Sequence, residues 1–366
     1  MRSKKRQGNF DVLKIIAIFL IALHHYAIWS GWKFDPGIHL NKLTAQTLVM
    51  GGKLGVNLFV MITGYFMINS KPKIKNLATI WVETTVITLF VYLTTIFFHL
   101  DGQVFKPFIF IRRLFPVVFG QYWFVVAYSL LYLSIPMINT VLLSSNLIKI
   151  KKGLFTGFIV LSISTYFYLN RGLNFSHPIW LAYVYCIGAY IRLNKDQYSK
   201  ISSSRNIAYI LVTILFSVLI NIGLQYLFSK PNLAITQTID FFGWTETIFY
   251  SRDASPLMLI LAVLIFILFM NIKFPARKLY SYLSRAAFAV YLLHTAPWFG
   301  VNYLLPVIVN ADRFYSSSMI FIYGILSMGL ISIVSVLIYT CLLPLINLIM
   351  QIIEKPIIFL QKFIFE

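Results

Sequence analysis

The sequence predicts an all-α integral membrane protein with about ten transmembrane helices and both termini in the cytoplasm. Of its 366 residues, 59% are hydrophobic and only 11% are charged, and the mean hydropathy is +0.80. Soluble domains carry roughly 25% charged residues. Apolar runs follow one another with short gaps, and most approach the ~20 residues that cross a bilayer. These observations exclude a soluble globular protein.

Ten apolar runs form a single polytopic domain over residues 1–366, which begins with a short basic tail at 1–10. They lie at about 11–30, 54–69, 78–98, 121–143, 154–169, 178–192, 206–228, 256–271, 286–309 and 317–349. Two connecting segments are long. We expect 99–120 to be a re-entrant or interfacial piece, because its apolar stretch is too short to span, and 229–255 to be an outward-facing lid.

The net charge of +20 comes from 31 Lys and Arg against 11 Asp and Glu, scattered over short loops. In a soluble chain this charge would suggest a nucleic-acid partner. Here it indicates topology and attraction to anionic lipid, so the expected partner is the bilayer and not nucleic acid. With the N-terminal tail inside, the inner segments hold 20 Lys and Arg and the outer ones 10. This bias predicts a multi-pass protein of the cell membrane with an even number of spans.

The first apolar run carries Asp11, Lys14, His24 and His25. Ionisable groups inside a span are costly and by default indicate function. On a helix, Lys14 and His25 lie about 20° apart around the axis and roughly 16 Å apart along it, and Asp11 shares their face. His24 points about 80° away, so His25 is the predicted functional histidine. The alternative is that both histidines sit at the outer interface, bonded to neighbouring helices.

A second motif, GVNLFVMITGYFMI, covers residues 55–68. Its two glycines allow close helix approach, and Asn57 and Thr63 can form hydrogen bonds between helices. On its own, this pattern is typical of an ordinary packing helix.

Together with two later motifs, these patterns resemble the acyltransferase-3 family of integral membrane acyltransferases. The motifs, in chain order, are Asp11 with Lys14 and His25, 55–59 with 63–65, Trp123 and Phe124 with Tyr128 and Pro136, and 291–294, which ends in His294. Family members more often have Arg where Lys14 stands. Many also have an Arg-rich stretch where this chain has Lys71, Lys73 and Lys75, a change that would remove bidentate recognition of phosphate.

The resemblance implies an O-acyltransferase that moves an acyl group, usually acetyl, from cytoplasmic acyl-CoA to a hydroxyl of an envelope polysaccharide or a lipid-linked saccharide. Acyl-CoA is the expected donor substrate, and no bound cofactor or metal is expected. His25 acts either as the general base for the hydroxyl or as a covalent acyl carrier, and both remain open. Lys14 attracts the donor or stabilises negative charge, and Asp11 is its predicted i,i+3 partner.

Further candidates bind the substrates. Lys73 and Lys75 lie in a short inner loop and suit the CoA phosphates as point charges, although a topology signal alone would explain them. Trp123 is a candidate wall of an acyl or sugar site, or a residue of the aromatic belt. His294 is a candidate for the lining of the His25 cavity or for packing. Arg112 and Arg113 precede Trp123 on the outer side, where an anionic glycan or lipid phosphate would arrive.

Two alternatives have no acyl-transfer chemistry. A transporter or flippase for a lipid-linked sugar would also have about ten spans and buried charges, but inverted repeats or helices broken at corresponding positions, which would favour it, are not visible in the sequence. A membrane sensor or interaction partner without catalysis is favoured only if His25 is dispensable.

Overall fold

The computed structural model describes residues 7–167 and 177–365, which form helices and connecting turns without a strand. The first part contains α1 (Gly8–Trp29), α2 (Leu40–Leu48), α3 (Met50–Met67), α4 (Ile74–Phe97), η1 (Leu100–Gly102), α5 (Pro107–Leu114), α6 (Trp123–Ser144), α7 (Leu147–Gly157), η2 (Phe158–Ile163) and η3 (Ser164–Tyr166). The second contains α8 (His177–Leu193), α9 (Lys195–Tyr198), α10 (Ser203–Phe228), α11 (Ala234–Phe241), α12 (Ile248–Ser251), α13 (Pro256–Asn271), α14 (Lys278–His294), η4 (Phe299–Val309), η5 (Ala311–Phe314), α15 (Ile320–Ile352) and α16 (Glu354–Phe365).

Six helical segments within the described residues are long and apolar enough to cross a membrane. They are α1, the α2–α3 segment Leu40–Met67, α4, α6, α10 and α15. A seventh candidate pairs α14 with η4, but the two helices meet at an angle of 87°. The all-α membrane class is therefore confirmed, whereas the expected ten spans and the sides of the termini are not. The other predicted spans fall on shorter helices, namely α8 of 17 residues, α13 of 16, and α7 with η2.

The run at 286–309 is not the straight span that its composition suggests. It breaks after His294, where Trp298 has a left-handed φ of 69°, and continues as a π-helix that contains Pro306. A non-glycine residue with positive φ is strained. The break ends α14 beside the last turns of α1, so that His294 lies within hydrogen-bond distance of His25.

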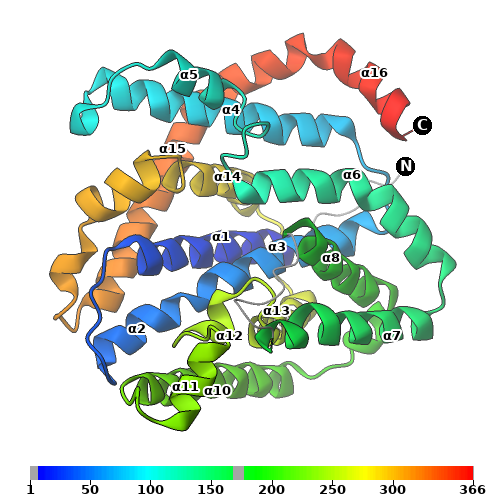
Figure 1. The fold of residues 1–366 in the computed structure, drawn as a ribbon. Coiled ribbons are helices and arrows are strands. Elements are labelled where there is room, and N and C mark those ends of the chain that lie inside the picture. The colour runs from blue at the N-terminus through cyan, green and yellow to red at the C-terminus, as the bar shows by residue number, and fades with distance from the viewer. Residues whose placement is uncertain (1–6, 168–176, 366) are drawn as a thin grey trace.

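The helices α1 and α3 run side by side through the middle of the molecule (Figure 1). In that view, α4 and α16 lie along one edge, and α10 and α11 lie along the opposite edge. The largest cluster of buried side chains surrounds α1 and α3 and includes residues of α8, α13 and α14. Any site on the facing surfaces of α1 and α3 therefore lies at the centre of the bundle.

Glycines bring the central backbones together. A Cβ atom at Gly55 would collide with the carbonyl oxygen of Ala17 on α1, and one at Gly64 would collide with that of Tyr185 on α8. Between helices in lipid, close packing of small residues replaces the hydrophobic effect as the main attraction. The motif at 55–68 thus packs α3 tightly against both neighbours.

The outer segment 229–255, expected to be a lid, is fastened to α2 and α3 by charged side chains. Glu246 pairs with Lys42 of α2 at 2.7 Å, and Asp253 forms a short ion pair with Lys53 of α3. The Trp244 indole also donates to the carbonyl of Tyr166 at 2.9 Å. These contacts make the segment a fixed cover over α2 and α3 in this structure.

The other long segment contains α5, which follows η1 and packs against α4 (Figure 1). Phe108, Ile111 and Phe115 are exposed on it, and Arg112 and Arg113 lie in its last turn. An eight-residue helix with an apolar face and basic residues suits a position in the membrane interface, in line with the expectation for 99–120.

The close crossing of α3 and α8 leads to a prediction about stability. Replacing Gly64 by Val should destabilise the protein by about 1–3 kcal/mol, because the new side chain must push the α8 backbone away. Thermal unfolding of the purified protein in detergent measures this change. Gly223 of α10 has open space around its Cα, so Gly223→Val is the control. An equal loss in both variants would contradict the packing argument.

Candidate functional site

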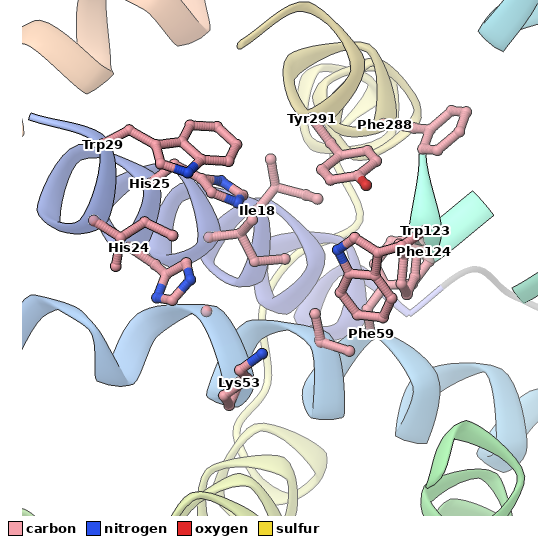
Figure 2. Close-up of a pocket in the computed structure, with 14 residues that line it drawn as sticks. Ile18, His24, His25, Trp29, Lys53, Phe59, Trp123, Phe124, Phe288 and Tyr291 are labelled. Carbon is pink, nitrogen blue, oxygen red and sulfur yellow. The ribbon is translucent and has the colours of Figure 1, made fainter. Parts of the chain in front are cut away.

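A cavity of about 210 Å³ lies between α1, α3, α6 and α14 (Figure 2). Its lining is mostly aliphatic and aromatic, with three basic side chains, and comprises Ile18, Ile21, His24, His25, Ile28, Trp29, Gly52, Lys53, Val56, Phe59, Trp123, Phe124, Phe288 and Tyr291. Apolar walls with a few convergent polar groups are typical of small-molecule sites.

His25 projects from the last turns of α1 into this cavity and is held on two sides. Its Nδ1 lies 2.9 Å from Nε2 of His294, at the end of α14. Its ring stacks on Trp29 at 4.1 Å between centroids and an interplanar angle of 21°. The imidazole is therefore fixed in both position and plane.

The hydrogen-bond partners of His294 determine which ring nitrogen of His25 carries a hydrogen. Nδ1 of His294 lies 2.5 Å from the carbonyl oxygen of Val290, and a carbonyl oxygen only accepts, so this Nδ1 carries a hydrogen. With His294 neutral, its Nε2 is bare and accepts a hydrogen bond from Nδ1–H of His25. With His25 also neutral, its Nε2 is then a bare lone pair, the form that a general base requires.

Of the two positions that the sequence analysis left open for His294, the structure has the packed, hydrogen-bonded one. It is fully buried and is not part of the cavity lining. It lies behind His25 as seen from the cavity, so the arrangement gives it contact with the catalytic candidate and not with a substrate. The two histidines are 269 positions apart in sequence, and the bend after α14 brings them together.

His24 also lines the cavity, which the helical-wheel argument did not predict. Its Nδ1 bonds to the carbonyl oxygen of Val49 at 2.8 Å, and its ring lies 5.1 Å from that of His25. A Cβ at Gly52 would collide with the His24 ring, so the imidazole rests directly on the α3 backbone. A backbone carbonyl thus fixes this second ring, whereas a second histidine orients His25.

Lys14 and Asp11 lie further back along α1. Asp11 is buried in the first turn, and Lys14 is half-buried with its ammonium 6.0 Å from the centre of the Phe59 ring. Phe59 itself lines the cavity. Lys14 therefore approaches the cavity from behind Phe59, on the side away from Trp29.

A charged cluster that sequence reasoning missed lies at the Trp123 side of the cavity. Lys53 lines the cavity with its ammonium 5.9 Å from the Trp123 ring centre, and it pairs with Asp253. His177, at the start of α8, bonds the other carboxylate oxygen of Asp253 at 2.9 Å and lies 4.5 Å from the Trp123 ring. A sequence signal for Lys53 did exist. The apolar helical segment begins at Leu40 and not at residue 54, so Lys53 is a cation inside a candidate span.

The state of Asp253 follows from these contacts. Burial alone would raise the pKa of its carboxyl, but the hydrogen bond from His177 and the charge of Lys53 together hold that pKa well below its usual value. The carboxylate is therefore ionised at any physiological pH, and it keeps the Lys53 ammonium in place.

The predicted donor-binding lysines lie elsewhere. Lys73 and Lys75 are exposed at the start of α4, on the side of the molecule where α1 begins (Figure 1). Lys75 lies 3.7 Å from Glu354 and lines an open cavity of about 570 Å³ together with Arg285 and Glu83. Glu83 is buried and accepts a hydrogen bond from Tyr339 at 3.1 Å.

Arg112 and Arg113 are not part of the lining of the His25 cavity. Arg113 donates to the side-chain oxygen of Gln121 at 2.5 Å and to the carbonyl oxygen of Pro297 at 3.2 Å. These bonds tie the end of α5 to the break after α14, which is a structural role. Trp123, by contrast, stands in the cavity wall, which is one of the two positions that the sequence analysis left open for it.

Comparison with known proteins identifies the chain at the level of a family. The acyltransferase-3 family model, described as an acyltransferase domain, matches residues 7–346. This range covers nearly the whole chain and includes every residue that forms the cavity. No curated protein and no solved structure matches.

The hydrogen-bond chain from His25 to Val290 predicts the tautomer of His25. In protein with ¹⁵N-labelled histidine in lipid nanodiscs, the Nε2 resonance of His25 should lie in the unprotonated range. His294→Ala should redistribute His25 between both tautomers, because Nδ1–H loses its acceptor.

The His25 resonance is assigned by its loss in His25→Gln. His39→Gln, at an exposed loop position, is the control and should leave the His25 signal unchanged. A His25 ring protonated mainly at Nε2 in the unmodified protein would show that the hydrogen-bond chain runs the other way.

Proposed function

Because the chain belongs to the acyltransferase-3 family, we propose that it transfers an acyl group, acetyl in the first instance, from acyl-CoA to a hydroxyl of a cell-envelope polysaccharide or a lipid-linked saccharide. The observation that supports this chemistry best is the imidazole of His25 in the lining of a mostly apolar cavity, with its Nδ1 bonded to His294. The location in the cell membrane is part of the proposal.

The reaction requires an activated alcohol, because a hydroxyl is a weak nucleophile at neutral pH. Nε2 of His25 takes the hydroxyl proton as the oxygen attacks the acyl carbonyl, a contribution typically of 10²–10⁴-fold. The same imidazolium then returns the proton to the departing thiolate. A covalent acyl-histidine remains the competing pathway, and the fixed lone pair on Nε2 suits that pathway equally well.

The size of the cavity supports a short acyl group. About 210 Å³ is less than the roughly 300–1,000 Å³ of sites that enclose a drug-sized ligand. The side chains Ile18, Phe59 and Tyr291 are among those that line it.

The donor is proposed to approach from the side where α1 and α4 begin. Lys73 and Lys75 are exposed cations there, and the CoA phosphates are their natural partners. Lys14, behind Phe59, carries positive charge from that side toward the cavity, and Asp11 is proposed to keep it in place. The acceptor is proposed to arrive at the opposite end of the cavity, past Trp29.

A transporter for lipid-linked sugars is less well supported. Broken helices at corresponding positions of two halves are typical of that class. Among the described residues, the bent pair of α14 and η4 has no counterpart that passes the same test, and the transporter alternative does not explain why one histidine orients another.

We predict different outcomes for the two adjacent histidines. His25→Ala should lower acyl transfer by 10²–10⁴-fold, while His24→Ala should retain substantial activity. A lost interhelical hydrogen bond, worth about 0.6 kcal/mol, is too small to cause such a fall through stability alone. Acyl esters on the surface glycan are measured in a strain that lacks the gene and is complemented with each variant.

Membrane levels of the two variants are matched by immunoblotting before activities are compared. Equal activity in both variants, or a His25 variant that is lost only because it does not insert, would remove the basis for His25 as the catalyst.

A second prediction concerns the donor. Changing Lys73 and Lys75 together to Gln should raise the KM for acetyl-CoA by about tenfold or more, because each charge-assisted hydrogen bond contributes roughly 1.5–3 kcal/mol and 1.4 kcal/mol is tenfold in affinity. Lys149→Gln with Lys151→Gln, on α7, changes the same net charge elsewhere and serves as the control. An unchanged KM in the first variant would leave Lys73 and Lys75 with a topological role alone.

A further inference from the structure

We propose that Lys53 is a further catalytic residue, which stabilises the negative charge on the acyl oxygen during transfer, and that Asp253 positions it. The inference rests on the acyl transfer proposed above. It is carried by the different surroundings of two lysines on the same helical segment, Lys42 and Lys53.

Lys42 has every feature of a structural cation. Its side chain is 4% exposed, and its ammonium lies within hydrogen-bond distance of three oxygen atoms. These are Oε1 of Glu246 at 2.7 Å and the carbonyls of Asp35 at 3.2 Å and Gly37 at 3.4 Å. The second oxygen of Glu246 accepts from Gln46 at 2.6 Å. All three N–H groups of Lys42 therefore have acceptors, and none is left for a ligand.

Lys53 has fewer hydrogen-bond acceptors than Lys42, as expected for a cation that binds a ligand. It pairs with one carboxylate, that of Asp253, and its side chain is 19% exposed at the cavity. Among the described residues, no second acceptor is within hydrogen-bond distance of its ammonium. Two of its three N–H groups are thus available on the side where Figure 2 shows the ammonium directed into the cavity, between His24 and Trp123.

The neighbours of Lys53 hold its ammonium in place. The carboxylate of Asp253 is fixed from the other side by His177 at 2.9 Å, and the Trp123 ring lies 5.9 Å from the ammonium. A cation held in advance inside an apolar cavity stabilises developing charge more effectively than one in water, because no reorganisation is needed. Lys53 and the base His25 line the same cavity, as a reaction centre between them requires.

The proposed reaction gives His25 and Lys53 one role each. The acceptor oxygen forms a bond to the acyl carbon, its proton moves to Nε2 of His25, and the electron pair of the C=O bond moves onto the acyl oxygen. This oxyanion accepts hydrogen bonds from the Lys53 ammonium, which keeps its proton. When the C=O bond forms again, the C–S bond breaks, and the CoA thiolate takes the proton back from His25. The products are the ester and free CoA thiol.

The test compares Lys53→Met and Lys53→Arg in purified protein in nanodiscs. The probe is radiolabelled acetyl-CoA with an envelope fraction from a strain that lacks the gene. Lys53→Met should lower kcat by about 10²–10³-fold, the usual effect of losing one oxyanion donor, with KM for acetyl-CoA changed less than threefold. Lys53→Arg should recover part of kcat, because it keeps the charge but not the geometry.

Two further variants separate catalysis from folding. In Lys53→Met with Asp253→Asn, no unpaired carboxylate remains, so stability should return to near that of the unmodified protein while kcat stays low. Lys42→Met with Glu246→Gln is the matched control, because it removes the other lysine–carboxylate pair between α2–α3 and the outer segment. Its kcat per folded molecule should stay within about threefold of the unmodified protein.

The outcomes are distinguishable. A Lys53→Met variant with normal kcat but raised KM, or a double variant at Lys53 and Asp253 with normal kcat, would overturn the inference. If His25→Ala in the same assay abolishes transfer while Lys53→Met does not, the inference alone fails. If His25→Ala keeps the full rate, or the unmodified protein transfers no label, the proposed acyl transfer fails together with it.

Discussion

Backbone contact between α1 and α3 is the constraint on which the site depends. In lipid, helices gain little from burying apolar surface, so they associate where small residues let their backbones meet. Gly51 and Gly55 provide that contact, because a Cβ at either would collide with a backbone carbonyl of α1, that of Leu20 or of Ala17. Since Lys53 lies directly between them in sequence, the crossing that brings the helices together also sets a cation opposite His24 and His25. A larger residue at either glycine would therefore move the cation away from the imidazoles.

Several polar side chains deep in this apolar protein are bonded to one another. Each buried polar side chain in the bilayer must find its partners within the chain. Gln46 and Glu246, for example, join Asn221 and Lys42 in one network that links α2, α10 and the outer segment. This network fastens the outer segment to α2 and α10, and the separate pair of Asp253 with Lys53 fastens the same segment to α3. The surroundings of the cavity are thus assembled from distant parts of the chain through polar bonds.

Sequence reasoning predicted the helical membrane class and some residues that line the cavity. It missed the features that depend on contacts between distant parts of the chain. Periodicity and motif order were enough for the all-α membrane class and the family, whereas the expected ten spans are not confirmed. They also selected His25 and Trp123, which both line the cavity and whose roles stay predictions. The helical-wheel argument placed His24 on another face, because it considers only the direction of each Cα–Cβ bond. The long imidazole side chains of two adjacent residues can nevertheless both reach the same cavity. The bend after His294, the position of that residue behind His25, and the pair of Lys53 with Asp253 depend on contacts between residues about 200 or more positions apart, and no local pattern encodes them.

The carbonyl at the end of the hydrogen-bond chain has a consequence for proton movement. In a triad that ends in a carboxylate, negative charge faces the imidazolium, whereas here His294 ends on the neutral oxygen of Val290. A proton taken up by His25 shifts no further than His294, because a peptide carbonyl does not accept it. The proton must therefore leave through Nε2, on the side by which it arrived. Transfer by this route would leave no proton in the protein, because the proton of the acceptor hydroxyl ends on the CoA thiol and none passes beyond His294 to the Val290 carbonyl. The site would therefore exchange one acyl group for one hydrogen between its two substrates.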